Sequence, residues 1–431
     1  MTEQGVIEPR RSLEGVRMAK VRQLWRQPEV ADLPAEVHAQ LEAAGALARI
    51  APGDEIAITA GSRGIAAMPT VIKAIVEAVR GRGGRPFIFP AMGSHGGGNA
   101  EGQRELLAEL GIDERSMGAP IRSDMAVVQL GESPSGLPVY LDANAARATG
   151  IILANRIKKH TNFDGEIESG LCKMAVIGMG KHRQAVAVHH HGSDGLRRYI
   201  PEVAACMFAR APILAGLGLV ENARGGVAEL HGLRPEEIVA REPALLARAK
   251  VLSPKIPFQQ IDIGIVERLG KEISGTGMDC YVIGRKRIIG EDEWPEAPYI
   301  RSLVVLDVTP ASHGNALGVG LADFTTQRLV DQIDWPALRA NILTSGNMER
   351  GKIPLPYETD RGAIEAAAFR ERAIACEALR IVAIRDTLHL EHLLVSEALL
   401  PEVRAHSDLE IEGDLAPLPF DAHGCWASPL T

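Results

Sequence analysis

The pattern of apolar and polar positions in the first part of the chain predicts strands and helices in alternation. Short apolar runs alternate with stretches whose apolar residues recur at helical spacing. The elements predicted are strands at 54–60, 85–89 and 150–154 and helices at 34–47, 69–79 and 100–110, with a short helix from Asp142. This order is typical of a parallel sheet with helices packed on its faces.

A second strand-rich set begins after residue 255. Its predicted strands lie at 261–266, 281–283, 303–307 and 379–384. A charged helix at 235–253 precedes it, and Pro254 and Pro257 mark the boundary between the two sets. We therefore predict an α/β protein of two domains, 1–255 and 256–431, each with a largely parallel sheet flanked by helices. The active site is expected in the cleft between them.

Loops that follow the strands are the places to look for chemistry, because open parallel sheets bind ligands at the carboxyl ends of their strands. In the first domain these loops are 61–66, 91–99 and 155–165.

Composition and charge narrow the classes of function. The 431 residues carry 47 Lys and Arg against 55 Asp and Glu, a net charge of -8, which disfavours a nucleic-acid binder. Five cysteines without paired spacing indicate reduced thiols in a cytoplasmic protein. No secretory signal is visible at the start of the sequence. The apolar stretch 203–220 is divided by Pro212 and two glycines, which favours a buried helix and a core strand over a membrane span.

The loop 91–99 has the most unusual composition. Its residues Gly93, Ser94, His95 and Gly96 lie between a strand and a helix, where glycines let the backbone approach a ligand and the helix start favours an anion. The spacing does not meet the dinucleotide fingerprint. A flexible turn with an exposed histidine is the alternative, and we favour a functional loop.

The segment 155–173 is dense in basic side chains and includes His160 and Lys173. This density is compatible with an anionic ligand, although Lys158 and Lys159 alone are typical of a solvated rim. Lys173 lies in an apolar neighbourhood, where a lysine usually extends its amine to water and less often becomes a nucleophile.

Three consecutive histidines, His189, His190 and His191, form the third candidate. In an extended segment His189 and His191 would share one face of the chain. Histidine is a common metal ligand, but three adjacent rings with no second cluster do not complete a tetrahedral zinc site. One metal ligand or an exposed polar turn are both compatible with the pattern.

Taken in order, these pieces resemble the nickel-dependent lactate racemase family. The matching elements span roughly residues 50 to 290. They are Ser62-Arg63 after the first strand, Gly93-Ser94-His95, a His upstream of Ser-Gly-x-x-Lys (His160, and Ser169 to Lys173), His189 sixteen residues after that lysine, and the turn Gly275 to Asp279. The chain departs from the family at Leu171-Cys172, where familiar members have Gly-Arg, and at Gly96, where they have Arg.

The resemblance implies a role for each matching residue. Lys173 is expected to tether a cofactor through a thioamide, and His189 to bind nickel with His190 or His191 as neighbours or substitutes. His95 and His160 are the expected paired acid/base residues, and Arg63 binds the substrate carboxylate or the cofactor. Further cofactor contacts are expected from Ser62, Gly93, Ser94, Gly96, Asp279 and Lys286.

The implied reaction is racemisation or epimerisation of a 2-hydroxy acid, lactate-like or a sugar acid. The implied cofactors are nickel and pyridinium-3,5-bisthiocarboxylic acid mononucleotide, the nickel-pincer nucleotide, supplied by cofactor-biosynthesis enzymes. Hydride leaves and returns to the substrate carbon while a histidine on each side exchanges the hydroxyl proton, which accounts for two histidines on different loops. The metal needs one imidazole because the cofactor brings its other donors.

Two other classes of function remain open from the residues. One is a hydrolase or lyase that uses the histidines around zinc or iron. The other is a non-catalytic two-domain protein that closes on an anionic metabolite, which fits the glycine loops but gives no role to Lys173.

Overall fold

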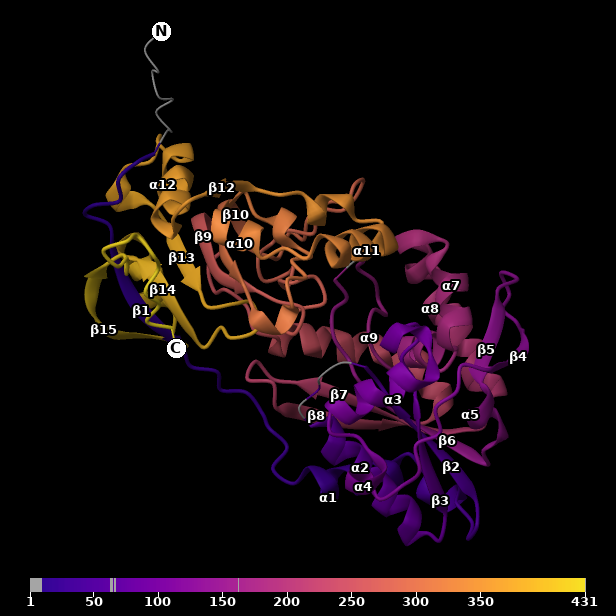
Figure 1. Ribbon diagram of the computed structural model, residues 1–431. Coiled ribbons are helices and arrows are strands. Elements are labelled where there is room, and N and C mark those ends of the chain that lie inside the picture. The colour runs from indigo at the N-terminus through magenta and orange to yellow at the C-terminus, as the bar shows by residue number, and fades with distance from the viewer. Residues whose placement is uncertain (1–9, 63–64, 66, 162, 431) are drawn as a thin grey trace. The chain divides into compact units, whose positions relative to one another are not determined.

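The computed structural model describes residues 10–62, 65, 67–161 and 163–430, without the side chains of Ser193 and Asp194. The chain forms two compact units (Figure 1). One is Gln27–Ser253, and the other joins the N-terminal segment up to Arg26 to Pro254–Thr431. The N-terminal segment therefore differs from the prediction, which assigned it to the first domain. Its strand finds its hydrogen-bonding partners near the other end of the chain.

The unit Gln27–Ser253 is built on a five-stranded sheet. Its strands, in spatial order, are β3 (Arg85–Pro90), β2 (Glu55–Ala60), β6 (Gly150–Arg156), β7 (Ile213–Glu221) and β8 (Val227–Leu233). The first four are parallel, and β8 returns antiparallel to β7. β4 (Val127–Glu132) and β5 (Pro138–Asp142) form a separate hairpin.

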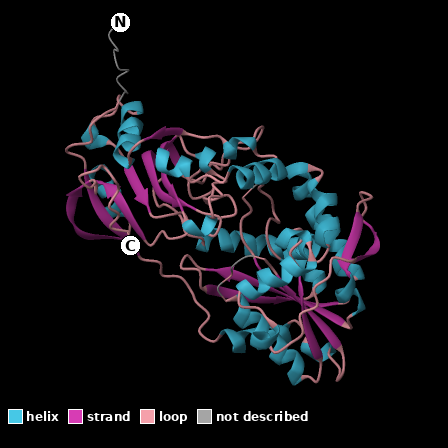
Figure 2. Ribbon diagram, viewed as in Figure 1, coloured by secondary structure: helices cyan, strands magenta, loops and turns pink. Residues whose placement is uncertain are grey.

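Helices cover both faces of this sheet (Figure 2). Ile56 and Ile58 of β2 point to one core, and Ala57 between them points to the other, as the alternation of side chains along a strand requires. The first core contains α1 (Leu33–Ala43), α2 (Met68–Gly81) and α3 (Ala100–Glu109). The second contains α6 (Leu171–Lys173), α8 (Gly192–Arg210) and α9 (Pro235–Leu252). Strands buried on both faces explain the continuous apolar runs in the sequence.

The remaining helices of this unit are α4 (Glu114–Met117), α5 (Ala143–Arg147) and α7 (Lys181–His189). The apolar stretch 203–220 forms the end of α8 and the buried strand β7, which confirms the helix-and-strand prediction. No helix within the described ranges combines the length and apolar character that crossing a membrane requires.

The other unit contains an eight-stranded sheet. Its strands, in spatial order, are β12 (Leu355–Tyr357), β11 (Phe324–Thr326), β10 (Tyr299–Val308), β9 (Gln260–Leu269), β13 (Ile381–Ile384), β14 (His392–Ser396), β1 (Arg17–Gln23) and β15 (Leu409–Pro417). The first five are parallel and the last three antiparallel. Its helices are α10 (Gln327–Asp331), α11 (Trp335–Ser345), α12 (Asp360–Arg370) and α13 (Leu400–Ala405). The predicted fold class, α/β with parallel sheets flanked by helices, is confirmed, and the expected cleft between domains stays a prediction.

The prediction of a strand at 281–283 is wrong. These residues form turns, and the carboxylate of Asp279 accepts hydrogen bonds from the backbone N–H groups of Tyr281 (2.9 Å) and Val282 (3.4 Å). Val282 and Ile283 are apolar because they fill the core, not because they join a sheet.

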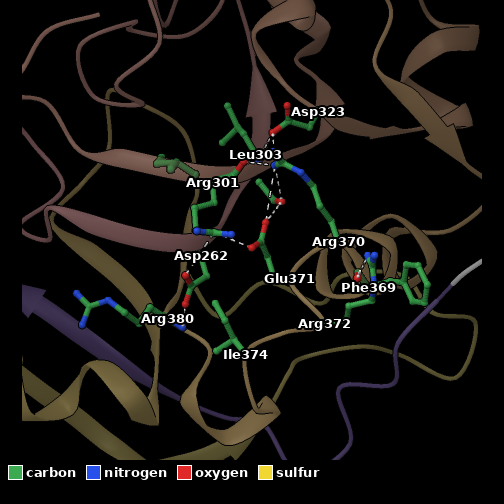
Figure 3. A network of polar contacts seen from close by, with 12 residues as sticks. Asp262, Arg301, Leu303, Asp323, Phe369, Arg370, Glu371, Arg372, Ile374 and Arg380 are labelled. Carbon is green, nitrogen blue, oxygen red and sulfur yellow. Dashed lines mark hydrogen bonds and ion pairs between the residues drawn. The ribbon is translucent and has the colours of Figure 1, made fainter.

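A buried carboxylate joins α12 to β10 in this unit (Figure 3). Glu371, 1% exposed, accepts hydrogen bonds from Arg301 Nε (2.6 Å) and Ser302 Oγ (2.9 Å). Beside it, Asp323 pairs with the buried Arg285 guanidinium (2.6 Å). These acidic side chains compensate the arginines around them, so the network is a structural one.

Candidate functional site

The strands β2 and β6 diverge at their carboxyl ends. Their backbone pairing runs only to Ile58 and Ile152. Beyond it, the buried Thr59 inserts its hydroxyl, which accepts a hydrogen bond from Ala154 N (2.9 Å). Helices that follow β2 and β6 lie on opposite faces of the sheet, so this is the topological switch point where open α/β sheets bind ligands.

The glycine-rich loop after β3 lies beside the loop after β2. The hydroxyl of Ser62 is hydrogen-bonded to Nδ1 of His95. Gly93 has a φ of 62°, and a Cβ there would lie 3.1 Å from a methyl group of Ile177, so both conformation and space require glycine. Gly96 also has a left-handed φ, of 61°, and Ser94 and His95 are exposed.

Lys173 is half-buried at the end of α6, immediately before a π-helical turn, Met174–Gly178. The turn is recorded by the hydrogen bond from Met179 N to Met174 O (2.9 Å). Single π-helical turns within helices are frequent at functional sites. Spacing in the sequence gave no sign of this irregularity.

The segment that carries Lys173 packs against both loops. A Cβ at Gly61 would lie 3.2 Å from Cε of Met174. A Cβ at Gly178 would lie 2.7 Å from the carbonyl oxygen of Ala91, so the absence of a side chain there allows the close approach. Three chain segments therefore meet at one edge of the sheet, those next to Ser62, His95 and Lys173.

His189 is the last residue of α7, so the three consecutive histidines do not form an extended segment in which His189 and His191 would share one face. The residue as a whole is exposed, yet the protein around the imidazole desolvates it and so lowers the pKa of His189, and the positive charge of Lys173 lowers that pKa further. The structure thus brings Lys173 and His189 within electrostatic reach, sixteen residues apart in the chain.

The neighbours of His189 are exposed. His190 and His191 stack edge to face, with ring centroids 5.4 Å apart, and His191 also packs on Tyr199 at 4.9 Å. Throughout the described part of the chain, no group of three or more His, Cys, Asp or Glu residues is placed to hold a metal ion.

His160 lies in a loop that is closed on itself. Lys158 and Ser169 exchange backbone hydrogen bonds (2.7 and 3.2 Å) at the base of the loop. The His160 ring lies on the buried Phe163, with centroids 4.5 Å apart, and its backbone N–H donates to a carboxylate oxygen of Glu168 (2.7 Å). Glu168 is 1% exposed and pairs with Lys250 (2.7 Å). Burial raises the pKa of Glu168 while that amine opposes the rise, so this carboxylate fixes the loop from inside.

A second buried carboxylate lies at the start of α6. Glu242, from α9, accepts a hydrogen bond from Cys172 N (2.9 Å), next to Lys173. Burial raises the pKa of Glu242 to about 6 and raises that of the Cys172 thiol, which the carboxylate raises further. Glu242 therefore holds the N-terminal end of the helical segment that carries the lysine.

No family model matches the sequence, and no curated protein matches it. Among solved structures, the chain is similar to the lactate racemase apoprotein from Thermoanaerobacterium thermosaccharolyticum, with 14% identity and a TM-score of 0.48. The similarity covers 85% of this chain and 94% of that chain. At this identity and score it assigns no activity to the present protein.

Three further candidate residues were predicted from the sequence, namely Arg63, Asp279 and Lys286. Arg63 lies outside the described residues. Asp279 and Lys286 belong to the unit with the eight-stranded sheet, where Asp279 caps a turn and Lys286, 3% exposed, pairs with Glu291 (3.0 Å). Their roles at the cofactor stay predictions.

Sequence reasoning missed the buried polar residues behind the candidate site. They are Glu168, Glu242, Gln103 and Lys181. In the sequence each lies in a segment where a polar residue is ordinarily solvated, so no pattern distinguishes it from a surface position.

Proposed function

We propose that the chain is a racemase or epimerase of a 2-hydroxy acid that works with the nickel-pincer nucleotide. The observation that carries the proposal is the packing of the Lys173 segment against the loops of Ser62 and His95, at the edge where open parallel sheets bind ligands. The positive charge of Lys173 also acts on the His189 imidazole. The bond between Ser62 and His95, on loops that pack against the Lys173 segment, adds an acid/base candidate at the same edge.

The residues fit the implied cofactor. A histidine with a lowered pKa is neutral at pH 7, which is the form that binds a metal. One imidazole is sufficient when the other donors belong to the nucleotide. His189 would hold the nickel and Lys173 the nucleotide, with the glycine loop 93–96 supplying backbone N–H groups.

The protein's own residues supply the proton chemistry. When bound, the nickel nucleotide supplies the site that accepts and returns hydride. Because Ser62 engages Nδ1 of His95, we assign proton exchange with the substrate hydroxyl to Nε2. His160, stacked on Phe163 and held by Glu168, serves the other side of the substrate. Each acid/base of this kind contributes about 10²–10⁴ in rate. Arg63 is proposed to bind the substrate carboxylate, and Lys286 and Asp279 to assist from the other unit.

The test compares His189→Ala with His191→Ala, both produced with the enzymes that make the cofactor and without them. Nickel is measured by elemental mass spectrometry, and lactate and sugar acids are offered with chiral analysis of the products. We expect nickel and stereoisomer interconversion in the wild type and in His191→Ala, and loss of both in His189→Ala. Stoichiometric nickel in His189→Ala would remove the ligand assignment.

The same experiment distinguishes the proposed racemase or epimerase from the other two classes of function. Zinc or iron in the isolated protein, independent of the cofactor-making enzymes, would support a hydrolase or lyase and refute the proposal. A loaded protein that interconverts no hydroxy acid would also refute it.

A further inference from the structure

A lysine is fully buried beneath the glycine-rich loop. Lys181 has a side chain that is 0% exposed, and its Nζ donates hydrogen bonds to the carbonyl oxygen of Pro90 (2.5 Å) and to Oε1 of Gln103 (3.1 Å). It also forms an ion pair with Oδ2 of Asp142 (3.3 Å), itself 0% exposed. The ammonium group therefore donates two hydrogen bonds, and the Asp142 carboxylate balances its charge at ion-pair distance.

Gln103 connects this lysine to the loop. Its side chain is fully buried, and Nε2 donates to the carbonyl oxygens of Gly93 (3.0 Å) and His95 (3.2 Å). Lysine can only donate, so Lys181 requires the oxygen of the Gln103 amide to face it. The amide nitrogen must then face the two carbonyls. Lys181 therefore fixes the direction of the amide as well as its position.

The loop needs such an anchor. Gly93, Gly96, Gly97 and Gly98 all have left-handed φ values, between 61° and 67°, and glycines supply no side chains that could restrain the backbone. Gln103 holds the carbonyl groups on both sides of Ser94, while Ser62 holds the ring of His95.

The buried Lys181–Asp142 ion pair costs more free energy than a purely structural contact requires. Burying an ammonium and a carboxylate costs several kcal/mol per ion, and well-packed apolar residues are often at least as stable. Burial lowers the pKa of Lys181 and raises that of Asp142, with each partner opposing the shift of the other. Lys181 also holds a left-handed φ of 56°, which is rare for a residue with a side chain.

We propose that Gln103 and Lys181 are positioning residues that fix the backbone of His95 for proton exchange with the substrate. The inference rests on the proposed function and adds to it the part of the structure that holds one of its acid/base groups. A displacement of about 1 Å at a reacting group can reduce the rate about 100-fold, so an anchor of this kind acts on turnover.

The test uses Gln103→Met, with Gln184→Met as the matched control. Gln184 is equally buried in the same unit, but its Oε1 accepts from Tyr140 N (2.8 Å), in the hairpin, and not from the loop. Gln103→Glu is a second variant that keeps the size and the acceptor for Lys181 while replacing the amide donor. Nickel content, kcat and KM are measured on cofactor-loaded full-length enzyme, and amide hydrogen exchange of residues 92–99 on the same samples.

In Gln103→Met we expect unchanged nickel content, kcat lowered about 10- to 100-fold, KM within about twofold, and loop exchange at least about tenfold faster. Gln184→Met should match the wild type in all four. The inference would be overturned if both Gln103 variants had the same loop hydrogen exchange and the same kcat as Gln184→Met. If the cofactor-loaded wild type shows no turnover, the proposed function is refuted instead. In that case the hydrogen exchange of residues 92–99 alone tests whether Gln103 anchors the loop.

Discussion

Replacing Glu242 by glutamine should change how the stability of the unit Gln27–Ser253 depends on pH. The carboxyl group is 1% exposed, and burial raises its pKa from 4.5 to about 6. Glutamine has nearly the same shape, keeps an oxygen that can accept from Cys172 N, and does not ionise. The substitution therefore removes a titration while preserving the contact at the start of α6.

The direction of the effect follows from proton binding. Between pH 4.5 and 6 the folded protein holds a proton that the unfolded chain has released, so the free energy of unfolding falls as pH rises through this range. The difference between a pKa of 4.5 and one of about 6 corresponds to about 2 kcal/mol in full, of which about 1 kcal/mol is lost between pH 5 and pH 8. Glu242→Gln should lack this loss, so its stability relative to wild type should rise by about 1 kcal/mol over that interval.

The assay must report on the correct unit. The four tryptophans lie outside Gln27–Ser253. They are Trp25, Trp294, Trp335 and Trp426. Their fluorescence therefore follows the other unit, and amide hydrogen exchange of β6 and β7 in urea, corrected for intrinsic rates, is the suitable measurement. Equal pH dependence in wild type and Glu242→Gln would refute the account of this buried carboxylate, as would a difference of the opposite sign.

Two other carboxylates lead to expectations of the same kind. Glu168→Gln removes the charge that pairs with Lys250, so the amides of residues 158–169 should exchange hydrogen at least about tenfold faster and turnover should fall. Glu166→Gln, at an exposed position in the same loop, is the control. Equal exchange in the two variants would contradict the role of Glu168. Glu371→Gln weakens the charged hydrogen bonds that join α12 to β10 and should cost about 1.5–3 kcal/mol, measured by urea unfolding with tryptophan fluorescence. The exposed Glu377→Gln should cost almost nothing, and a Glu371 variant as stable as this one would contradict the reading of the network.

The sequence predicted the parallel strands well because they are buried on both faces. The apolar run at 54–60 corresponds to β2, and the run at 150–154 to the greater part of β6. The antiparallel strands β14, β1 and β15 were not predicted, since pairing between residues nearly 400 positions apart leaves no local pattern. The segment 281–283 shows the opposite failure, because a buried turn can be as apolar as a strand.

The sequence pointed to residues of the candidate site itself but not to the buried groups that hold them. Loop position after a strand pointed to His95, whereas Lys173 was predicted only from the family resemblance. The structure places the chain segments of these two residues in contact. The groups behind them depend on pairings that sequence does not reveal. Gln103 is meaningful only because Lys181, 78 residues later, faces its amide.

The place of β1 between β14 and β15 has a consequence for synthesis on the ribosome. This strand is synthesised before the unit Gln27–Ser253, and its partner β14 begins about 370 residues later. At about 5–20 residues per second it waits roughly 20–75 s, while the continuous segment Gln27–Ser253 can complete its own sheet. Arg17, Lys20 and Arg22 give the waiting strand a positive charge, which discourages pairing with other nascent chains. The yield of this unit should therefore depend on translation speed and on chaperone access.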